Sequence, residues 1–271
     1  MPMPANLYKL KNLVKLIPTT TLCILFLLLT ANKPTTLQKT KIKLITIDAG
    51  HGGHDAGCMY GGAREKEVTL GIALKLGETI EKMMPDVKVI YTRKTDEFIE
   101  LHERAGIANR NNADLFISVH CNANKKTDVF GTETFSMGLH KSEGNLDIAK
   151  RENDVILLEK DYKEQYEGFD PNSPESHIYF SFLQGAYLDQ SLRLASLIES
   201  NFTKVHCASR GVKQAGFMVL WRSKMPSILI ETGFLSNKND RSQLTSNEGQ
   251  QKIVDAITKG VIEYKKQVES K

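Results

Sequence analysis

Several features are scarce in this 271-residue sequence, and each absence excludes a class of protein. Its four cysteines follow neither the spacing of a disulfide framework nor that of a short zinc motif. The formal net charge is only +4, and three positive charges belong to Lys9, Lys11 and Lys15 near the N-terminus. The remainder is nearly neutral, which gives no reason to expect a nucleic acid as partner. There is also no internal repeat and no second module.

Long apolar runs are missing as well. Residues 22–29 (LCILFLLL) follow the three lysines and precede Thr30 and Ala31, where a small residue permits cleavage. This run is much shorter than the roughly 20 residues that span a bilayer, so a signal peptide is favoured over a stable membrane anchor. We therefore expect a signal peptide at residues 1–31 and a linker at 32–41. The mature protein would be exported to the periplasm or, alternatively, secreted to the exterior.

In the rest of the chain, segments with the apolar pattern of a strand alternate with segments that have the apolar pattern of a helix. Short β-branched or apolar runs predict strands at 42–49, 87–92, 114–119, 131–135, 217–221 and 227–231. Amphipathic or apolar patterns predict helices at 65–84, around 101–108, at 184–205 and at 248–267. This alternation predicts an α/β fold with a largely parallel (mixed) central sheet and helices on both faces.

Four ionisable residues are predicted to meet at one edge of this sheet. His51 follows the first strand, His120 follows the third, and Glu231 ends the last. In open α/β sheets, ligands gather beyond the carboxyl ends of the strands. Glu65 starts the first helix, across a glycine-rich loop from His51. Two imidazoles and one carboxylate suit Zn²⁺ and leave a fourth position for water, so His51, Glu65 and His120 are candidate metal ligands.

Each of these residues also has an ordinary structural explanation. A histidine after a strand is often a surface or hydrogen-bonded residue, and a glutamate at a helix start complements the helix dipole. Glu231 could pair with a nearby arginine. The intervals of 14 and 55 residues between the candidate ligands match no short helical zinc motif. Spacing alone therefore leaves both interpretations open.

Four sequence blocks, in a fixed order, resemble the signature of a known enzyme family. They are residues 48–53 (DAGHGG), 64–66 (REK), 118–123 (SVHCNA) and 226–237 (PSILIETGFLSN). With these blocks the chain resembles the zinc-dependent N-acetylmuramoyl-L-alanine amidases of type 3, from about residue 42 to the final helix. The resemblance implies that the substrate is peptidoglycan and that the amide between N-acetylmuramic acid and L-alanine is hydrolysed.

The resemblance carries over to individual positions. His51, Glu65 and His120 match the zinc ligands of the family, and Glu231 matches its catalytic glutamate. Bound Zn²⁺ lowers the pKa of its water to roughly 7, and Glu231 would take the proton and return it to the departing alanine nitrogen. We therefore expect a zinc amidase catalytic domain at residues 42–267, with roles in cell-wall turnover and daughter-cell separation.

Neighbours of the candidate ligands need separate interpretations. Asp48 and Asn122 are close enough in sequence to orient the histidines, although Asp48 could equally brace the glycine loop. His54 lies at a position that varies in the family, which indicates a solvated loop residue and not a fourth ligand. Cys121 is next to His120, but side chains alternate along a strand, so a buried apolar role is favoured over metal contact or nucleophilic attack.

Residues 141–183 interrupt the α/β pattern. Helical spacing recurs between 141 and 161, and the stretch at 162–174 has the composition of a loop. Members of the family that act in cell separation carry a helical insertion here, which covers the active site and is displaced by a LytM-like activator protein. The resemblance thus implies a regulatory insertion in which Glu152 or Glu159 occupies the open zinc position. An ordinary surface excursion is the alternative.

Two other functions remain as alternatives. Another zinc exopeptidase or deacylase on a related scaffold would act on cell-wall peptides but cleave a different bond. A non-catalytic wall-binding module would be expected to have lost a zinc ligand or the catalytic acid, and this chain retains both.

Overall fold

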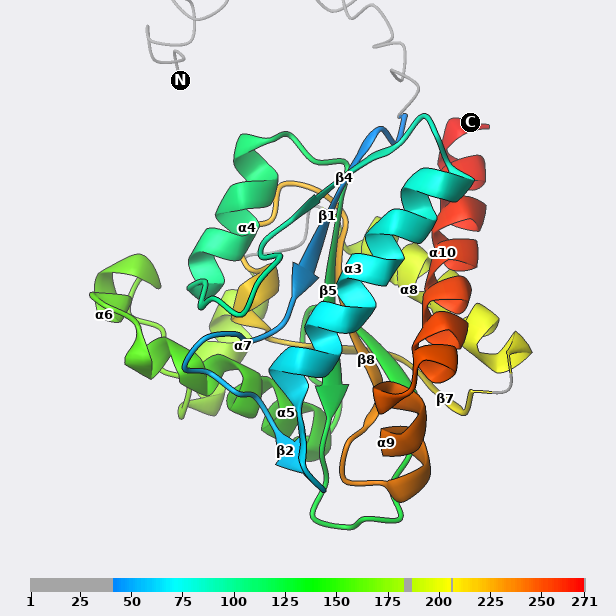
Figure 1. Ribbon diagram of the computed structural model, residues 1–271. Coiled ribbons are helices and arrows are strands. Elements are labelled where there is room, and N and C mark those ends of the chain that lie inside the picture. Colours follow the sequence, from blue (N-terminus) through cyan, green and yellow to red (C-terminus); the bar gives the residue numbers. More distant parts are fainter. Residues whose placement is uncertain (1–40, 183–186, 206, 271) are drawn as a thin grey trace, which may run out of the picture. The chain divides into compact units, whose positions relative to one another are not determined.

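The computed structural model describes residues 41–182, 187–205 and 207–270, so the predicted signal peptide and nearly all of the linker lie outside the described residues. A six-stranded sheet has the order β4-β1-β5-β8-β6-β7 (Figure 1). The strands are β1 Leu44–Ala49, β4 Lys88–Tyr91, β5 Leu115–Asn122, β6 Thr132–Met137, β7 Ser209–Ala215 and β8 Ser227–Phe234. Neighbouring strands are parallel except for β6 and β8, which are antiparallel. The predicted largely parallel, mixed sheet is confirmed.

Three long helices cover one face of the sheet. They are α3 Glu65–Met83, α8 Leu188–Lys204 and α10 Asn247–Glu269 (Figure 1). Along α3, Val68, Ile72, Leu76 and Ile80 recur every four residues and are buried together with Ile45, Ile47 and other apolar side chains of the sheet. This apolar stripe explains why the segment forms a helix and which of its sides meets the sheet.

The other face is covered by α4 Leu101–Arg110 and by the segment between β6 and α8. That segment forms α5 Glu143–Asn153, the 3-10 helix Asp154–Leu158, α6 Tyr162–Gln165 and α7 Pro174–Phe182. Four of its side chains belong to a second apolar core, which also contains Phe116 and Phe135 of the sheet; the four are Ala149, Ile156, Tyr166 and Phe169. The segment is therefore helical between 143 and 158, as predicted, but α6 forms within the stretch at 162–174 that was predicted as a loop. The apolar side chains of the segment complete the core on this face.

Several local features differ from the sequence-based predictions. The predicted strand at 217–221 is wrong, because residues Met218–Leu220 form a 3-10 turn. The edge strand is instead β7, whose mostly polar sequence SRGVKQA lacks the apolar alternation of a strand. The short helix α9 Lys238–Thr245 was not predicted. Strands β5 and β8 also continue past the predicted ends, so His120 lies within β5 and not after it, and Glu231 lies within β8 and not at its end.

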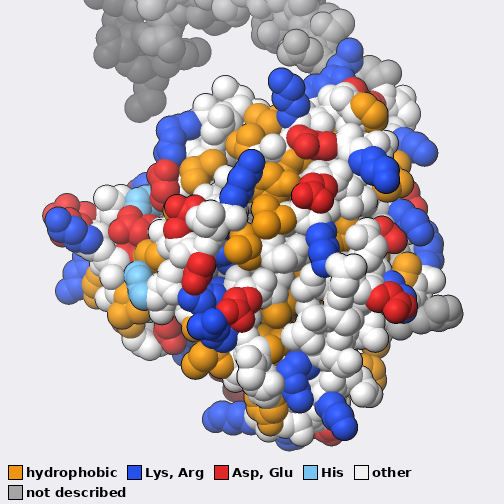
Figure 2. Space-filling view, viewed as in Figure 1, with side chains coloured by type: hydrophobic (Ala, Val, Ile, Leu, Met, Phe, Trp, Pro, Cys, Tyr) orange, Lys and Arg blue, Asp and Glu red, His pale blue; other side chains and the backbone are white. Residues whose placement is uncertain are grey.

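The carboxyl ends of β1, β5 and β8 meet at one edge of the sheet. Beside this edge, β2 Met59–Tyr60 and β3 Ala63–Arg64 form a small hairpin that leads directly into α3. On the face seen in Figure 2, lysine and arginine side chains are interspersed with aspartate and glutamate. Within the described ranges, no helix is both long enough and apolar enough to cross a membrane.

Candidate metal centre and active site

The structure brings His51, Glu65 and His120 together from three segments of the chain. His51 lies two residues after β1, Glu65 is the first residue of α3, and His120 belongs to β5. The Nε2 atom of His51 lies 3.1 Å from Oε1 of Glu65, and Nδ1 of His120 lies 3.2 Å from the same oxygen. All three side chains are buried or nearly so.

A fourth ligand atom comes from the insertion. Oε2 of Glu152, on α5, lies 3.2 Å from Nε2 of His51 and 3.1 Å from Nδ1 of His120. The other candidate, Glu159, lies elsewhere: it accepts hydrogen bonds from the amide of Leu101 at 2.8 Å and from the Tyr166 hydroxyl at 2.5 Å. The geometry thus selects Glu152 from the two glutamates that the sequence left open.

The four atoms suit a tetrahedral cation. Bonds of roughly 2.0–2.1 Å to Zn²⁺ require ligand atoms roughly 3.3–3.4 Å apart. The four separations between a histidine nitrogen and a glutamate oxygen are 3.1–3.2 Å, and the other two pairs lie within 4.8 Å. The Nε2 atom of His51 and Oε2 of Glu152 are buried, and neither makes a hydrogen bond with any described residue. Burial alone would lower the pKa of His120, but Glu152 and Glu65 raise it to about 9. A cation would displace that proton and neutralise the paired carboxylates.

Two glycines permit this close assembly. A Cβ atom at Gly50 would lie 2.5 Å from the His120 ring, and one at Gly57 would lie 2.6 Å from the His51 ring and 2.7 Å from Oε2 of Glu65. Gly57 also has a φ of +64°, which favours glycine. The glycine-rich loop therefore allows backbone to pass where any side chain would collide with the candidate ligands.

The orientation of His51 is fixed by Asp55, a residue outside the set predicted from the sequence. Oδ2 of Asp55 lies 2.7 Å from Nδ1 of His51. Burial would raise the pKa of this carboxyl, but its hydrogen bond with His51 lowers it. In a metal-loaded site, this hydrogen bond would keep the proton on Nδ1 and direct Nε2 of His51 to the ion. The sequence does contain a signal for this contact, because Asp55 lies four residues after His51 within the same glycine-rich loop.

Asp48 and Asn122 do not orient the histidines. Asp48 accepts hydrogen bonds from Thr92 and Ser118 at 2.6 Å each, and from Arg104 at 2.9 Å. Arg104 also donates to the backbone oxygen of His51 at 3.0 Å, so Asp48 braces the loop through this arginine. Asn122 accepts a hydrogen bond from Arg151 of the insertion.

Glu231 lies next to His120 across the β5–β8 pairing. Its carboxylate is fully buried, and neither oxygen has a hydrogen-bond partner among the described residues. The nearest cation is Arg151, with Nη2 at 3.9 Å from Oε1. Burial and the charges of Glu152 and Glu65 raise the pKa of Glu231 well above its ordinary value. A proton carrier beside the metal position needs this property.

Two other residues near the site agree with their predicted placement. Cys121 is fully buried in the apolar core with α3, although its Sγ atom lies within 4.8 Å of a Glu65 carboxylate oxygen and of Sγ of Cys58. His54 is exposed, and its ring packs on Phe98 with ring centroids 4.1 Å apart. Neither side chain belongs to the four-residue group.

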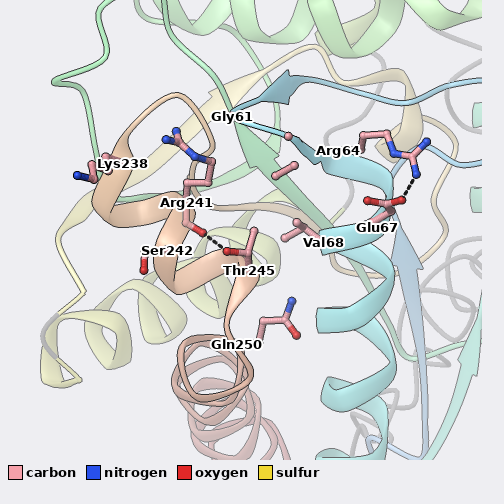
Figure 3. Close-up of a pocket in the computed structure, with 11 residues that line it drawn as sticks. Gly61, Arg64, Glu67, Val68, Lys238, Arg241, Ser242, Thr245 and Gln250 are labelled. Atoms are coloured by element: carbon pink, nitrogen blue, oxygen red, sulfur yellow. Dashed lines mark hydrogen bonds and ion pairs between the residues drawn. The ribbon is translucent and has the colours of Figure 1, made fainter.

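A cavity of about 370 Å³ lies beside His51 and Glu152. The insertion forms one of its walls, with Arg151, Glu152 and Leu158, and the glycine loop supplies His51 and Asp55. A larger cavity of about 640 Å³ lies between the β2–β3 hairpin and α9. Figure 3 shows that Arg64 there pairs with Glu67 along α3. Glu67 is the one carboxylate among the described lining residues, so the larger cavity holds no comparable group.

Comparisons with known proteins agree with this geometry. Residues 45–263 match the family Amidase_3, described as N-acetylmuramoyl-L-alanine amidase. The chain is 31% identical over 239 residues to the N-acetylmuramoyl-L-alanine amidase AmiA of Escherichia coli, which covers 86% of this chain and 80% of AmiA.

Two solved structures are similar in fold and sequence. The N-acetylmuramoyl-L-alanine amidase of Clostridium difficile 630 has a TM-score of 0.61 and 28% identity, covering 83% of this chain and 97% of that chain. The CwlD amidase of Clostridioides difficile, solved in complex with the GerS lipoprotein, has a TM-score of 0.60 and 27% identity, covering 82% of this chain and 98% of that chain. The chain therefore belongs to the N-acetylmuramoyl-L-alanine amidase family of peptidoglycan hydrolases.

Proposed function

We propose that this amidase depends on zinc and hydrolyses the amide between N-acetylmuramic acid and the L-alanine of the stem peptide. The observation that carries the proposal is the buried group of His51, Glu65, His120 and Glu152, whose ligand atoms all lie within 4.8 Å of one another. His51, Glu65 and His120 would hold the ion permanently. Glu231 would serve as the general acid and base.

An amide is a poor electrophile with a poor leaving group. Bound Zn²⁺ supplies a polarised carbonyl and a water of lowered pKa. Glu231 then has two tasks, to take the proton of the attacking water and to return it to the departing nitrogen. Its buried position beside His120 and its raised pKa suit both. Because the nearby Cys121 belongs to the core, the proposed reaction has no covalent enzyme intermediate.

We further propose that the insertion inhibits the enzyme at rest. Glu152 occupies the position where water or substrate would bind the ion, and Arg151 donates to the Ala123 backbone oxygen at 3.2 Å and to Asn122 at 3.0 Å. Activation would require α5 to move, as a LytM-like activator protein would bring about. A precedent for a bound partner is the related CwlD amidase, which forms a complex with the GerS lipoprotein.

The proposed setting is the cell wall outside the cytoplasmic membrane. A cleaved signal peptide would export the protein to the periplasm, with secretion as the alternative. There it would act in wall turnover and in the separation of daughter cells. These roles rest on the resemblance of residues 42–267 to amidases with such roles.

Purified sacculi provide the test. The mature protein should release intact stem peptides and leave bare glycan strands, and a chelator should abolish the release until Zn²⁺ is restored. Because the resting enzyme is expected to be weakly active, the assay should include a variant in which Glu152 is replaced by alanine. Release of single amino acids or of acyl groups would instead identify an exopeptidase or a deacylase. Binding without any release would identify a wall-binding module.

A further inference from the structure

A row of charged residues continues from the metal centre across the sheet. His120 on β5 pairs in register with Glu231 on β8, and Glu231 pairs in register with Glu133 on β6. The next strand, β7, supplies Arg210 and Lys213, which both contact Glu133. Side chains of residues paired in register lie on the same face of a sheet. The row therefore shares the face that the insertion covers.

Glu133 holds the two cations in place. Its side chain is buried, and its Oε1 atom accepts from Nε of Arg210 at 2.5 Å and from Nζ of Lys213 at 2.6 Å. Arg210 also lies over the Phe234 ring, 5.5 Å from its centroid. One carboxylate faces two cations, so one positive charge is left over. The side chains of Arg210 and Lys213 are 40% and 22% exposed, which leaves them accessible to a ligand.

The two cations lie over the rings of Phe234 and Phe135, and within the described ranges their remaining N–H groups meet no hydrogen-bond acceptor. These groups are the Nη atoms of Arg210 and the other N–H groups of Lys213. If the cations served only to neutralise Glu133, one would be enough. A second cation with free donors, in line with Glu231, is instead suited to bind an anion.

We propose that Arg210 and Lys213, held by Glu133, form an anion-binding subsite for a carboxylate of the stem peptide. This inference rests on the proposed function of the metal centre. The N-acetylmuramic acid side of the scissile amide is uncharged, because its only carboxyl group forms that amide. The anion must therefore belong to the peptide, where L-alanine is followed by D-glutamate.

The spacing agrees with this assignment. The charged groups of Arg210 and Lys213 meet at Glu133 on β6, which lies two strand separations from β5 and its His120. Two separations are roughly 10 Å at 4.7–4.9 Å each. An extended peptide covers about 3.3–3.6 Å per residue. The side chains of Arg210 and Lys213 are long and add to this reach. A carboxylate on the second residue beyond the scissile bond can therefore contact the subsite.

Two soluble substrates provide the test. They are N-acetylmuramoyl-L-alanyl-D-glutamate and its counterpart with the α-carboxylate converted to an amide. In the zinc-loaded full chain, with and without Glu152→Ala, KM should be about tenfold lower for the acid. Lys213→Gln and Arg210→Gln should each raise KM for the acid substrate and leave kcat unchanged. Each should thereby remove the preference for the acid over the amide. Arg210→Lys should keep part of the preference, and Lys259→Gln on α10 should match the parent.

Direct binding separates this inference from the proposed function. The peptide L-alanyl-D-glutamate is titrated into the Glu152→Ala chain, where binding needs no turnover. Binding that is lost in Lys213→Gln supports the subsite even if neither substrate is cleaved. Cleavage of both substrates with equal KM, or unchanged binding in both single variants, would overturn the subsite and leave the amidase activity intact. Binding of polyglycerol phosphate in place of the peptide would also overturn it. Each single variant leaves one cation on Glu133, and thermal unfolding checks that it folds.

Discussion

His120 and Glu231 stand directly opposite each other on the paired strands β5 and β8. His120 contributes a nitrogen to the four-atom group, and Glu231 is a buried carboxylate with no hydrogen bond to any residue that the structure describes. The sheet pairing itself thus sets the separation between the metal position and the proposed proton carrier. Backbone hydrogen bonds on both strands make that separation rigid, as preorganised catalysis requires.

The first prediction concerns the chemistry of Glu231. Glu231→Gln keeps the shape of the side chain but cannot carry the proton, so kcat should fall by about 10²–10⁴-fold. Zinc content should stay at one ion per chain, because Glu231 is outside the four-atom group. Rates of peptide release from sacculi and metal analysis of the same preparation check both points. A variant that clears sacculi at a near-normal rate would refute the role.

The same substitution has a predicted effect on stability. The raised pKa of Glu231 means that folding disfavours its charged form, so the buried carboxylate destabilises the protein at a pH above the unfolded value, about 4.3. In chelator, Glu231→Gln should therefore raise Tm at pH 7, and each kcal/mol corresponds to roughly 2–4 °C for a domain of this size. The gain should disappear below pH 4, where the carboxyl is protonated in both states. Equal Tm values at pH 7 would contradict the raised pKa.

Glu152 should act as the inhibitory ligand. Glu152→Ala removes the carboxylate that blocks the fourth position and should increase basal release from sacculi by at least about tenfold. Asp147→Asn, on an exposed position of the same helix α5, is the matched control and should leave activity unchanged. Initial rates at equal zinc occupancy check the comparison. An inactive but folded Glu152→Ala chain would argue that Glu152 supports catalysis and does not inhibit it.

Asp55 should tune the affinity for the metal. Loss of its hydrogen bond with Nδ1 of His51 frees the ring to rotate and to change tautomer, so Asp55→Ala should weaken zinc binding by about 10–100-fold. Competition with a zinc-chelating dye measures this change. His54→Ala, in the same loop, should bind zinc like the parent. If the two variants bound zinc equally well, Asp55 would have no part in positioning His51.

Much of the fold could be predicted, because its central strands and long helices have strong periodic patterns. The apolar residues of α3 recur with the period of a helix, and β1, β5 and β8 are the short apolar runs of buried strands. The structure has a helix and three strands at these places. The edge strand β7 could not be found in this way. It is polar over much of its length, and among the described strands it pairs with β6 alone, so its sequence carries no strong apolar signal.

The site was predictable only in part, for a related reason. Sequence placed His51, Glu65, His120 and Glu231 near one sheet edge, and the structure brings them together. The choice between Glu152 and Glu159 depends on where α5 ends. A regular helix through residue 160 would leave the choice open, but α5 stops at Asn153 and a 3-10 helix follows. The backbone then turns Glu159 toward the amide of Leu101, an interaction that no periodicity shows.

The apolar side chains of the insertion constrain how the enzyme can be switched on. Tyr166 and Phe169 are nearly fully buried against the sheet, so the insertion cannot swing away as a whole without exposing the second core to water. Such exposure costs roughly 25 cal/mol for each Å² of apolar surface. Release of Glu152 therefore calls for a pivot of α5 alone, or for a partner with a complementary apolar surface. In the second case, the affinity of the partner and the opening of the metal centre would be thermodynamically linked.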